Sequence, residues 1–277
     1  MTEKIIVCYL FTKFDNENTL SNFIKNYKKF KSGLDHKLLI CFKLLDEKKI
    51  NFLSKHLLGI KHNLFIDNST NNDFDLGSYK RISKKYLYNT IFFLNSHSYP
   101  ICDYWLSKIA QYQQLNTIIG TSASNESLLS SLKLKKFYKV FSFIYKKFYL
   151  KKKFFPFPNP HLRTTGFMIK GSDFYTYIKD KQIFSKLDAW EIESGKKSLT
   201  NYFRNKDYNI LLVNSDGACF NEKDWLHSET YNYLNQTKCI ISDKHSRKYS
   251  PSFLSPSSKS SQSIAASIHL IIWPGAN

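Results

Sequence analysis

The sequence predicts a single α/β domain whose central, mostly parallel sheet is flanked by helices. The first 120 residues alternate short apolar runs with longer amphipathic ones, which is the pattern of βα units. Several apolar runs also stop at clusters of polar residues, as strands do where their carboxyl ends border a ligand crevice. The 277 residues, 42% of them hydrophobic, are enough to form a sizeable core, which excludes a fully disordered chain.

Each element is predicted from its apolar pattern. Strands are expected where short runs are rich in apolar residues, at 5–11, 37–45, 63–66, 90–94, 117–120, 164–169 and 209–213. The first helix is predicted because apolar residues recur at spacings of three and four, at Leu20, Phe23, Ile24, Tyr27 and Phe30. The other expected helices lie at 50–58, 78–88, 100–114, 174–184 and 198–204. Residues 67–77 are polar and turn-rich, which predicts a loop.

The composition changes twice along the chain. Residues 1–235 are predicted to form the domain, and within them residues 132–157 form a basic aromatic insertion with nine lysines, ten aromatic residues and no carboxylate. Residues 236–277 are predicted to form a low-complexity, disordered tail, because 250–267 is rich in serine.

The charge balance is strongly positive, with 41 Lys and Arg against 22 Asp and Glu, or +19. An excess made mostly of lysine attracts nucleic acid, anionic lipid and phosphorylated substrates alike. The five cysteines are far apart and odd in number, which predicts neither a disulfide framework nor a zinc site. Without a signal-peptide pattern or a bilayer-length apolar run, we expect a cytoplasmic protein, with peripheral attachment to the inner face of the membrane left open.

Three polar clusters are candidates for a functional site. They are Asp67 with Asp73 and Asp75, the run Asn95-Ser96-His97, and residues 188–195. Polar groups at the ends of several strands converge on one crevice in a sheet of this kind. Each cluster taken alone is also explained as a turn or a helix cap, as Asp75 and Ser78 would be for the helix that follows.

The order of these pieces resembles the nucleotide-sugar glycosyltransferases of the GT-A fold, a Rossmann-like α/β architecture, and particularly the bacterial enzymes of polysaccharide and lipopolysaccharide assembly. The residues that carry the resemblance lie at 74–79, 92–97, 159–167, 193–195 and 225–228, so the resemblance spans most of the chain. It implies that residues 1–120 form a nucleotide-binding half and that 159–235 form the half that holds the acceptor and the catalytic group.

The resemblance also implies a set of donor-binding residues. Asp67 falls where the family has the aspartate that contacts the base or ribose, and Asp75 and Arg81 fall on the segment that lies against the donor. In the family the fourth strand ends in Asp-x-Asp, which holds a divalent cation, Mn²⁺ or Mg²⁺, on the diphosphate. Here these positions read Asn95-Ser96-His97, so dependence on a metal is left open.

Other residues are expected to replace or supplement that cation. His161 and Arg163 are the nearest candidates to meet the departing diphosphate, and Thr164 follows them on the diphosphate and acceptor side. His97 and His227 are the candidates for ligating a transition ion. An ordinary loop pair after Pro160 explains His161 and Arg163 equally well.

An inverting transfer needs a general base that removes the proton of the acceptor hydroxyl. In the family this base is a carboxylate late in the domain, and this stretch contains Asp188, Glu191 and Glu193. Glu193, ahead of Ser194-Gly195, matches the motif best, and Glu191 is the reserve. On a helix, residues two apart do not share a face, so at most one of the two glutamates is expected to reach the substrate.

The leading functional hypothesis is a glycosyltransferase that moves a hexose-like sugar from a nucleoside diphosphate to a glycan or lipid-linked acceptor in cell-surface polysaccharide synthesis. Residues 132–157 then suggest contact with an anionic membrane surface. The structural alternative for this segment is a long amphipathic helix with its aromatic residues in the core. The functional alternative is a non-catalytic protein that binds glycans or nucleic acid, although the candidate carboxylates would repel a phosphate backbone.

Overall fold

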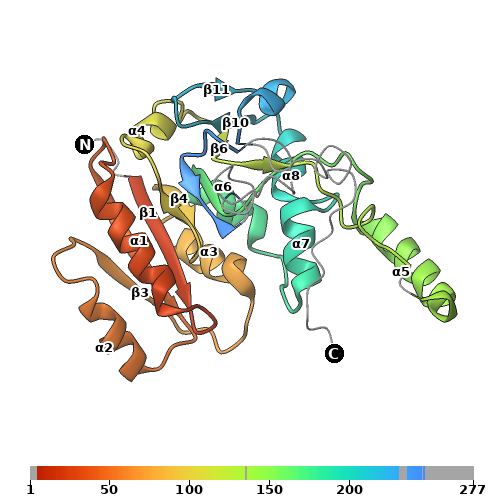
Figure 1. Cartoon of the computed structure of the whole chain (residues 1–277), viewed down its shortest axis with the longest axis horizontal. Coiled ribbons are helices and arrows are strands. Elements are labelled where there is room, and N and C mark those ends of the chain that lie inside the picture. Colours follow the sequence, from red (N-terminus) through yellow and green to blue (C-terminus); the bar gives the residue numbers. More distant parts are fainter. Residues whose placement is uncertain (1–4, 135, 231–235, 245, 247–277) are drawn as a thin grey trace, which may run out of the picture.

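Eight strands form one central sheet in the order β11-β10-β6-β9-β4-β1-β2-β3 (Figure 1). The computed structural model describes residues 5–134, 136–230, 236–244 and 246. The strands of the sheet are β1 (Ile5–Thr12), β2 (His36–Lys43), β3 (Asn63–Asp67), β4 (Thr90–Leu94), β6 (Thr117–Gly120), β9 (Gly166–Lys170), β10 (Asn209–Val213) and β11 (Cys219–Phe220). Neighbouring strands run parallel, except that β9 is antiparallel to β4 and β6, and β11 to β10. The predicted α/β fold with a mostly parallel sheet is confirmed.

Helices cover both faces of this sheet. The helices are α1 (Glu17–Lys29), α2 (Glu47–Lys55), α3 (Phe74–Lys85), α4 (Trp105–Ala110), α5 (Val140–Lys153), α6 (Gly171–Ile178), α7 (Lys186–Ser194) and α8 (Leu199–Arg204). Two 3₁₀ turns, η1 (Phe137–Lys139) and η2 (Glu222–His227), and four two-residue strands, β5 (Tyr99–Pro100), β7 (Ala123–Ser124), β8 (His161–Leu162) and β12 (Ile241–Ser242), complete the described elements.

The alternation of side chains along β1 builds two cores. Tyr9 and its neighbours on one face pack with α1, α2 and α4, where Trp105 is fully buried. Cys8 and its neighbours on the other face pack with α3, α6 and α8, including Tyr79. Because both faces are covered, the strands read as continuous apolar runs in the sequence.

Two helices differ from the prediction. Helix α3 begins at Phe74, inside the segment predicted to be a loop, and its N-cap position is Asp73. The helix predicted at 100–114 is reduced to α4, because Pro100 belongs to β5 and Tyr104 has a positive φ of 59° just before the helix. A left-handed residue at this point interrupts the helical backbone.

The segment predicted to begin the tail is part of the fold. Strand β12 pairs with β5, and Ile240 and Ile241 are buried in the core next to β4 and α4. Sequence composition missed this short contact because the serine-rich residues that follow dominate the pattern. The rest of the predicted tail, from 247 to 277, lies outside the described residues.

Candidate functional site

The candidate site lies at the carboxyl ends of the parallel strands. Thr12 at the end of β1 is in register with Lys43 at the end of β2, and Lys43 with Asp67 at the end of β3. Strand β4 runs beside β1 and ends at Leu94, directly before Asn95-Ser96-His97. The strand pairing therefore brings four loops that carry polar side chains to one edge of the sheet.

A half-buried carboxylate, Asp15, joins the loops after β1 and β4. Ser96 Oγ donates a hydrogen bond to Asp15 Oδ1 at 2.6 Å, and the backbone and hydroxyl of Thr12 donate to Oδ2 at 2.8 and 2.7 Å. Tyr9 fixes the same loop by donating from its hydroxyl to the carbonyl oxygen of Ser96 at 2.7 Å. Asp15 was not selected from the sequence. It is the first carboxylate after the first buried strand, but a single carboxylate in a turn has no distinctive spacing.

The three residues in place of Asp-x-Asp form a compact turn. Asn95 Oδ1 accepts hydrogen bonds from the backbone of His97 at 3.1 Å and from Ser98 Oγ at 2.8 Å. Ser96 is buried, whereas the side chain of His97 is 39% exposed, with Nε2 3.8 Å from Asp15 Oδ1. The turn therefore presents His97 toward the solvent side of the site and uses Asn95 to hold its own backbone.

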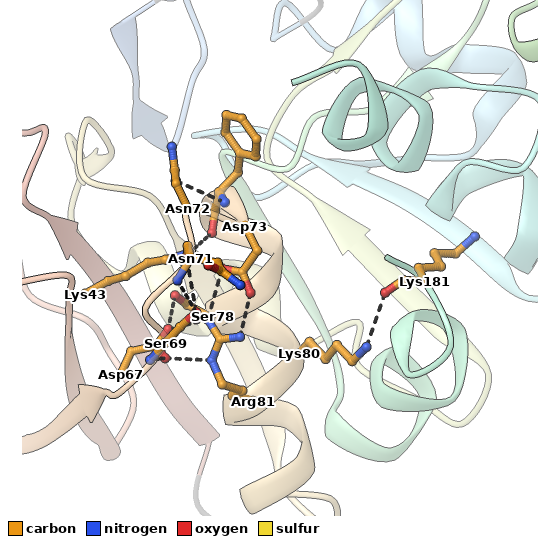
Figure 2. A network of polar contacts seen from close by, with 11 residues as sticks. Lys43, Asp67, Ser69, Asn71, Asn72, Asp73, Ser78, Lys80, Arg81 and Lys181 are labelled. Carbon is orange, nitrogen blue, oxygen red and sulfur yellow. Dashed lines mark hydrogen bonds and ion pairs between the residues drawn. The ribbon is translucent and has the colours of Figure 1, made fainter. Parts of the chain in front are cut away.

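The predicted donor residues Asp67 and Arg81 bind each other (Figure 2). Arg81 donates from Nε to Asp67 Oδ1 and from Nη2 to Asp67 Oδ2, both at 2.6 Å, and Ser78 Oγ donates to Oδ2 at 2.5 Å. The Asp67 side chain is fully buried, and that of Arg81 is 32% exposed. Asp67 thus holds Arg81 in a two-pronged ion pair, and direct contact between Asp67 and a nucleotide stays a prediction.

Asp73 extends this network to the end of β2. It accepts from Arg81 Nη1 at 2.6 Å and also pairs with the buried ammonium of Lys43, which in addition donates to the carbonyl oxygen of Phe74. Gly77 leaves room for it, because a Cβ there would lie 1.9 Å from Asp73 Cγ. The ion pairs of Asp73 with Lys43 and Arg81 therefore fix the start of α3 to the sheet. They require a glycine at position 77, one helical turn later, because a larger residue there would displace Asp73.

Asp75 lies among the charges of both halves of the site. The pKa of its carboxyl is raised to about 6, chiefly by burial and to a smaller extent by the nearby Asp15 and Glu193 carboxylates, while Lys43 acts in the opposite direction. Asp75 lies in the first turn of α3, a helix that contacts α7 of the second half. The structure therefore brings the predicted residues Asp75 and Glu193 together.

Glu193, near the end of α7, is held by Thr164, which lies between β8 and β9. Its Oε1 accepts two hydrogen bonds from Thr164, from the backbone nitrogen and from Oγ1, each at 2.9 Å. Among the described residues no hydrogen bond reaches its second oxygen, Oε2. One oxygen of the half-buried Glu193 carboxylate is thus held in place by two donors.

The two other predicted carboxylates of α7 have different partners. Glu191 forms an ion pair with Lys153 of α5 at 2.6 Å. Asp188 completes a capping box at the start of the helix, where it accepts from the Ser185 backbone and hydroxyl. These hydrogen bonds hold the pKa of Asp188 below its usual value, although desolvation opposes them. The expectation that Glu191 and Glu193 face different directions is consistent with these partners.

His161 and Arg163, the residues predicted to meet the diphosphate, are both buried and precede Thr164 in the chain. His161 Nδ1 donates to the carbonyl oxygen of Asn159 at 2.7 Å, and burial lowers the pKa of the ring, against a smaller raising effect from Glu193. Arg163 Nη1 lies 2.9 Å from Asp243 Oδ2. His161 belongs to β8, which contacts α7, the helix that contains Glu193. The charge of Arg163 is matched by a carboxylate from the segment after β12.

The residues present do not match the donor set of a divalent cation. No group of three or more His, Cys, Asp or Glu side chains that could hold a metal ion occurs in the described ranges. His227 is exposed on η2, and the structure does not join it with His97 in such a group. Hard cations such as Mg²⁺ and Mn²⁺ need several oxygen ligands, and the turn after β4 contributes no carboxylate.

Comparisons with known proteins gave matches to solved structures. No family model and no curated protein matches the sequence. The galactosyltransferase LgtC, solved with donor and acceptor sugar analogues, has a TM-score of 0.45 and 9% identity over 76% of this chain and 73% of its own. 4-Diphosphocytidyl-2C-methyl-D-erythritol synthase from Anaerococcus prevotii has a TM-score of 0.45 and 8% identity, covering 82% of this chain and 96% of its own. The glycosyltransferase GlyE of Streptococcus pneumoniae has a TM-score of 0.43 and 11% identity, covering 75% of this chain and 45% of its own.

Proposed function

We propose that the protein is a glycosyltransferase that moves a sugar from a nucleoside diphosphate to a glycan or lipid-linked acceptor, with Glu193 as the general base. The observation that carries this proposal is the geometry of Glu193. One carboxylate oxygen is anchored by both donors of Thr164, and the other has no partner among the described residues. A general base needs this combination of a fixed position and an oxygen free to accept a proton.

The proposed transfer inverts the anomeric configuration. The acceptor hydroxyl oxygen attacks the anomeric carbon of the donor sugar while Glu193 Oε2 takes the hydroxyl proton. The new carbon–oxygen bond forms as the bond to the diphosphate oxygen breaks, and the nucleoside diphosphate leaves with the electron pair. The anchoring by Thr164 fixes the base before the acceptor arrives, which lowers the entropic cost of reaching the reactive geometry.

The proposed donor site lies at the ends of β1 to β4. Arg81, one third exposed and held by Asp67, can meet an anionic or polar part of the nucleotide, and the carboxyl of Asp75 is influenced by the charges of both Asp15 and Glu193. Asn95, Ser96 and His97 border the donor from the β4 side, and His161, Arg163 and Thr164 border the diphosphate and the acceptor. No step is assigned to a metal, because no group of three or more His, Cys, Asp or Glu side chains that could hold such a cation occurs among the residues that the structure describes.

The test is release of the nucleoside diphosphate from a panel of UDP, GDP, CDP and dTDP sugars incubated with candidate glycan acceptors. We expect the wild-type protein to turn over one donor class and Glu193→Gln to lose transfer while still binding that donor. Glu47→Gln is the matched control, because Glu47 is exposed at the start of α2. Unchanged turnover in Glu193→Gln would remove Glu193 from the mechanism.

A role in cell-surface polysaccharide synthesis, with the enzyme at the inner face of the membrane, is the biological setting that we propose for this activity. No helix within the described ranges is long and apolar enough to cross a bilayer. Contact with a lipid-linked acceptor would then depend on a surface of the folded protein, and the structure offers one candidate.

A further inference from the structure

Helix α5 projects away from the sheet (Figure 1). Several of its apolar side chains are exposed to solvent. Phe141, Tyr145 and Phe148 are 83%, 76% and 63% exposed, and Phe137 in the preceding 3₁₀ turn is 92% exposed. The structural alternative from the sequence, that the aromatic residues of this segment lie in the core, is therefore wrong for these residues. We define the aromatic stripe as Phe137, Phe141, Ile144, Tyr145 and Phe148.

The stripe is a continuous face of the helix. Its members within α5 are spaced by three, one and three residues, so at 100° per residue they fall within about 100° of arc. Phe143 and Leu150 lie about 150–170° from the centre of this arc, and they are half-buried and buried against the body of the protein. Helix α5 therefore has one apolar side that packs on the fold and a second that meets solvent.

Lysines flank the exposed stripe. Lys147, Lys151 and Lys152 are exposed beside it, and residues 132–157 contain no carboxylate and no arginine. A protruding helix with exposed Phe, Tyr and Ile beside lysines is the combination that enters the headgroup region of an anionic bilayer. We propose that the aromatic stripe and its flanking lysines bind the surface of an anionic membrane.

Other occupants fit the stripe less well. Single-stranded nucleic acid is bound in basic grooves where bases stack on aromatic faces, whereas this stripe lies on a convex helix and includes the aliphatic Ile144. A second copy of the chain would bring two carboxylate-free, lysine-rich segments together, and their charges repel. An anionic lipid surface can bury the apolar side chains in its interface and attract the lysines with its negatively charged headgroups.

The helix is also connected to the candidate site. Lys153, the last residue of α5, pairs with Glu191 of α7 at 2.6 Å, and its carbonyl oxygen accepts from the backbone of Lys196 at 2.8 Å. Glu191 is two residues from Glu193 on the same helix. Membrane binding by α5 would therefore hold the α7 side of the site near the lipid surface, a consequence for the acceptor that rests on the proposed function.

Flotation with lipid vesicles tests the membrane surface without reference to catalysis. We expect the full chain to bind vesicles of equimolar phosphatidylglycerol and phosphatidylcholine and to bind phosphatidylcholine alone much more weakly. The double substitution Phe141→Ser, Phe148→Ser should weaken binding roughly tenfold or more, because two large side chains lose their burial in the interface. The triple substitution Lys147→Gln, Lys151→Gln, Lys152→Gln should weaken binding to the anionic vesicles roughly a hundredfold.

The matched control is Tyr88→Ser with Leu115→Ser, since these side chains are 81% and 83% exposed outside the stripe, and its vesicle binding should equal that of the wild type. The lysine variant keeps the test decisive if the phenylalanine variant does not fold, as judged by circular dichroism. Equal binding of wild type and both variants, or no binding to anionic vesicles, would overturn the proposal. The proposal would also be overturned if the wild type did not bind vesicles but did bind single-stranded DNA or form a dimer in solution, and if the phenylalanine variant lost that DNA binding or dimerisation.

Discussion

Thr164 and Glu193 form a two-donor clamp on a single carboxylate oxygen. The backbone nitrogen and Oγ1 of Thr164 both lie 2.9 Å from Glu193 Oε1, although the residues are 29 positions apart in the chain. The clamp joins the strand region before β9 to the last turn of α7. It fixes the orientation of the carboxylate, and Oε2 has no hydrogen-bond partner among the described residues.

Replacing Thr164 tests this clamp. Thr164→Val keeps the shape of the side chain and removes the hydroxyl donor, so the carboxylate is held by the backbone alone. We expect kcat to fall roughly tenfold with little change in the KM for the donor, since a hydrogen bond to a charged group contributes about 1.5–3 kcal/mol. Thr164→Ser keeps the donor and should stay close to wild type. Steady-state kinetics of the two variants make the comparison, and equal kcat values would rule out the hydroxyl as a positioning group.

The raised pKa of the Asp75 carboxyl predicts that the stability of the protein depends on pH. Its pKa is raised to about 6, chiefly by burial, so ionisation of this carboxyl costs more in the folded than in the unfolded protein, where its value is 3.8. Below about pH 4 both states are protonated and the penalty vanishes; it grows between about pH 4 and pH 6 and stays constant above. Asp75→Asn should therefore raise the free energy of unfolding above about pH 6, on the order of 1–2 kcal/mol after allowing for solvent screening.

Denaturant unfolding of the wild type and Asp75→Asn across this pH range measures the difference directly. The gain should shrink toward zero as the pH falls to about 4. A gain that is the same at both ends of the range would show that the substitution acts through packing rather than through charge.

The strand pattern was predictable from the sequence because buried parallel strands are continuous apolar runs. The apolar runs at 5–11 and 90–94 could be assigned as strands without knowing which strands pair with them. Both are core strands in the structure, with nearly the predicted limits. The start of α3 was not predictable in this way. Its first turn is fixed by pairs between Asp73, Lys43 and Arg81, which come from different parts of the chain and leave no local pattern.

The candidate site was predictable in part for the same reason. Strand ends pointed to Asp67, Asp75 and Asn95, and the resemblance to the GT-A glycosyltransferases pointed to Glu193. The pairing of Asp67 with Arg81 and of Arg163 with Asp243 depends on tertiary contacts that the sequence does not display. Asp15 was missed because a single carboxylate in a turn has no distinctive spacing, and only its bond to Ser96 reveals its place in the site.

Gly77 tests the packing at the start of α3. In an isolated helix, Gly77→Ala would be stabilising, but here the new Cβ would lie 1.9 Å from Asp73 Cγ. We expect the substitution to lower the free energy of unfolding by about 1–3 kcal/mol, because Asp73 must move away from Lys43 and Arg81. In an Asp73→Ala background the clash is absent, so adding Gly77→Ala should be neutral or stabilising. Equal effects of Gly77→Ala in the two backgrounds, measured by denaturant unfolding, would exclude the clash.

Arg81 tests the ion pair beneath the proposed donor site. Arg81→Lys preserves the charge and removes the planar fork that binds both oxygens of Asp67. We expect a loss of about 1–3 kcal/mol in unfolding free energy, because the buried Asp67 carboxylate loses hydrogen bonds that lysine cannot replace. Affinity for the donor nucleotide should fall as well. Thermal unfolding with and without nucleotide separates the two effects, and a variant with wild-type stability would contradict the role of the fork.

The central claim, a donor site for a nucleoside diphosphate at the carboxyl edge of the sheet, is tested most directly by thermal unfolding in the presence of UDP, GDP, CDP and dTDP in separate titrations. A ligand at about 100 times its dissociation constant stabilises by about 2.7 kcal/mol, which for a chain of this size corresponds to a rise of about 5 °C or more in Tm. We predict such a rise with one of the four nucleotides. The absence of a shift with all four would contradict the assignment of a donor site.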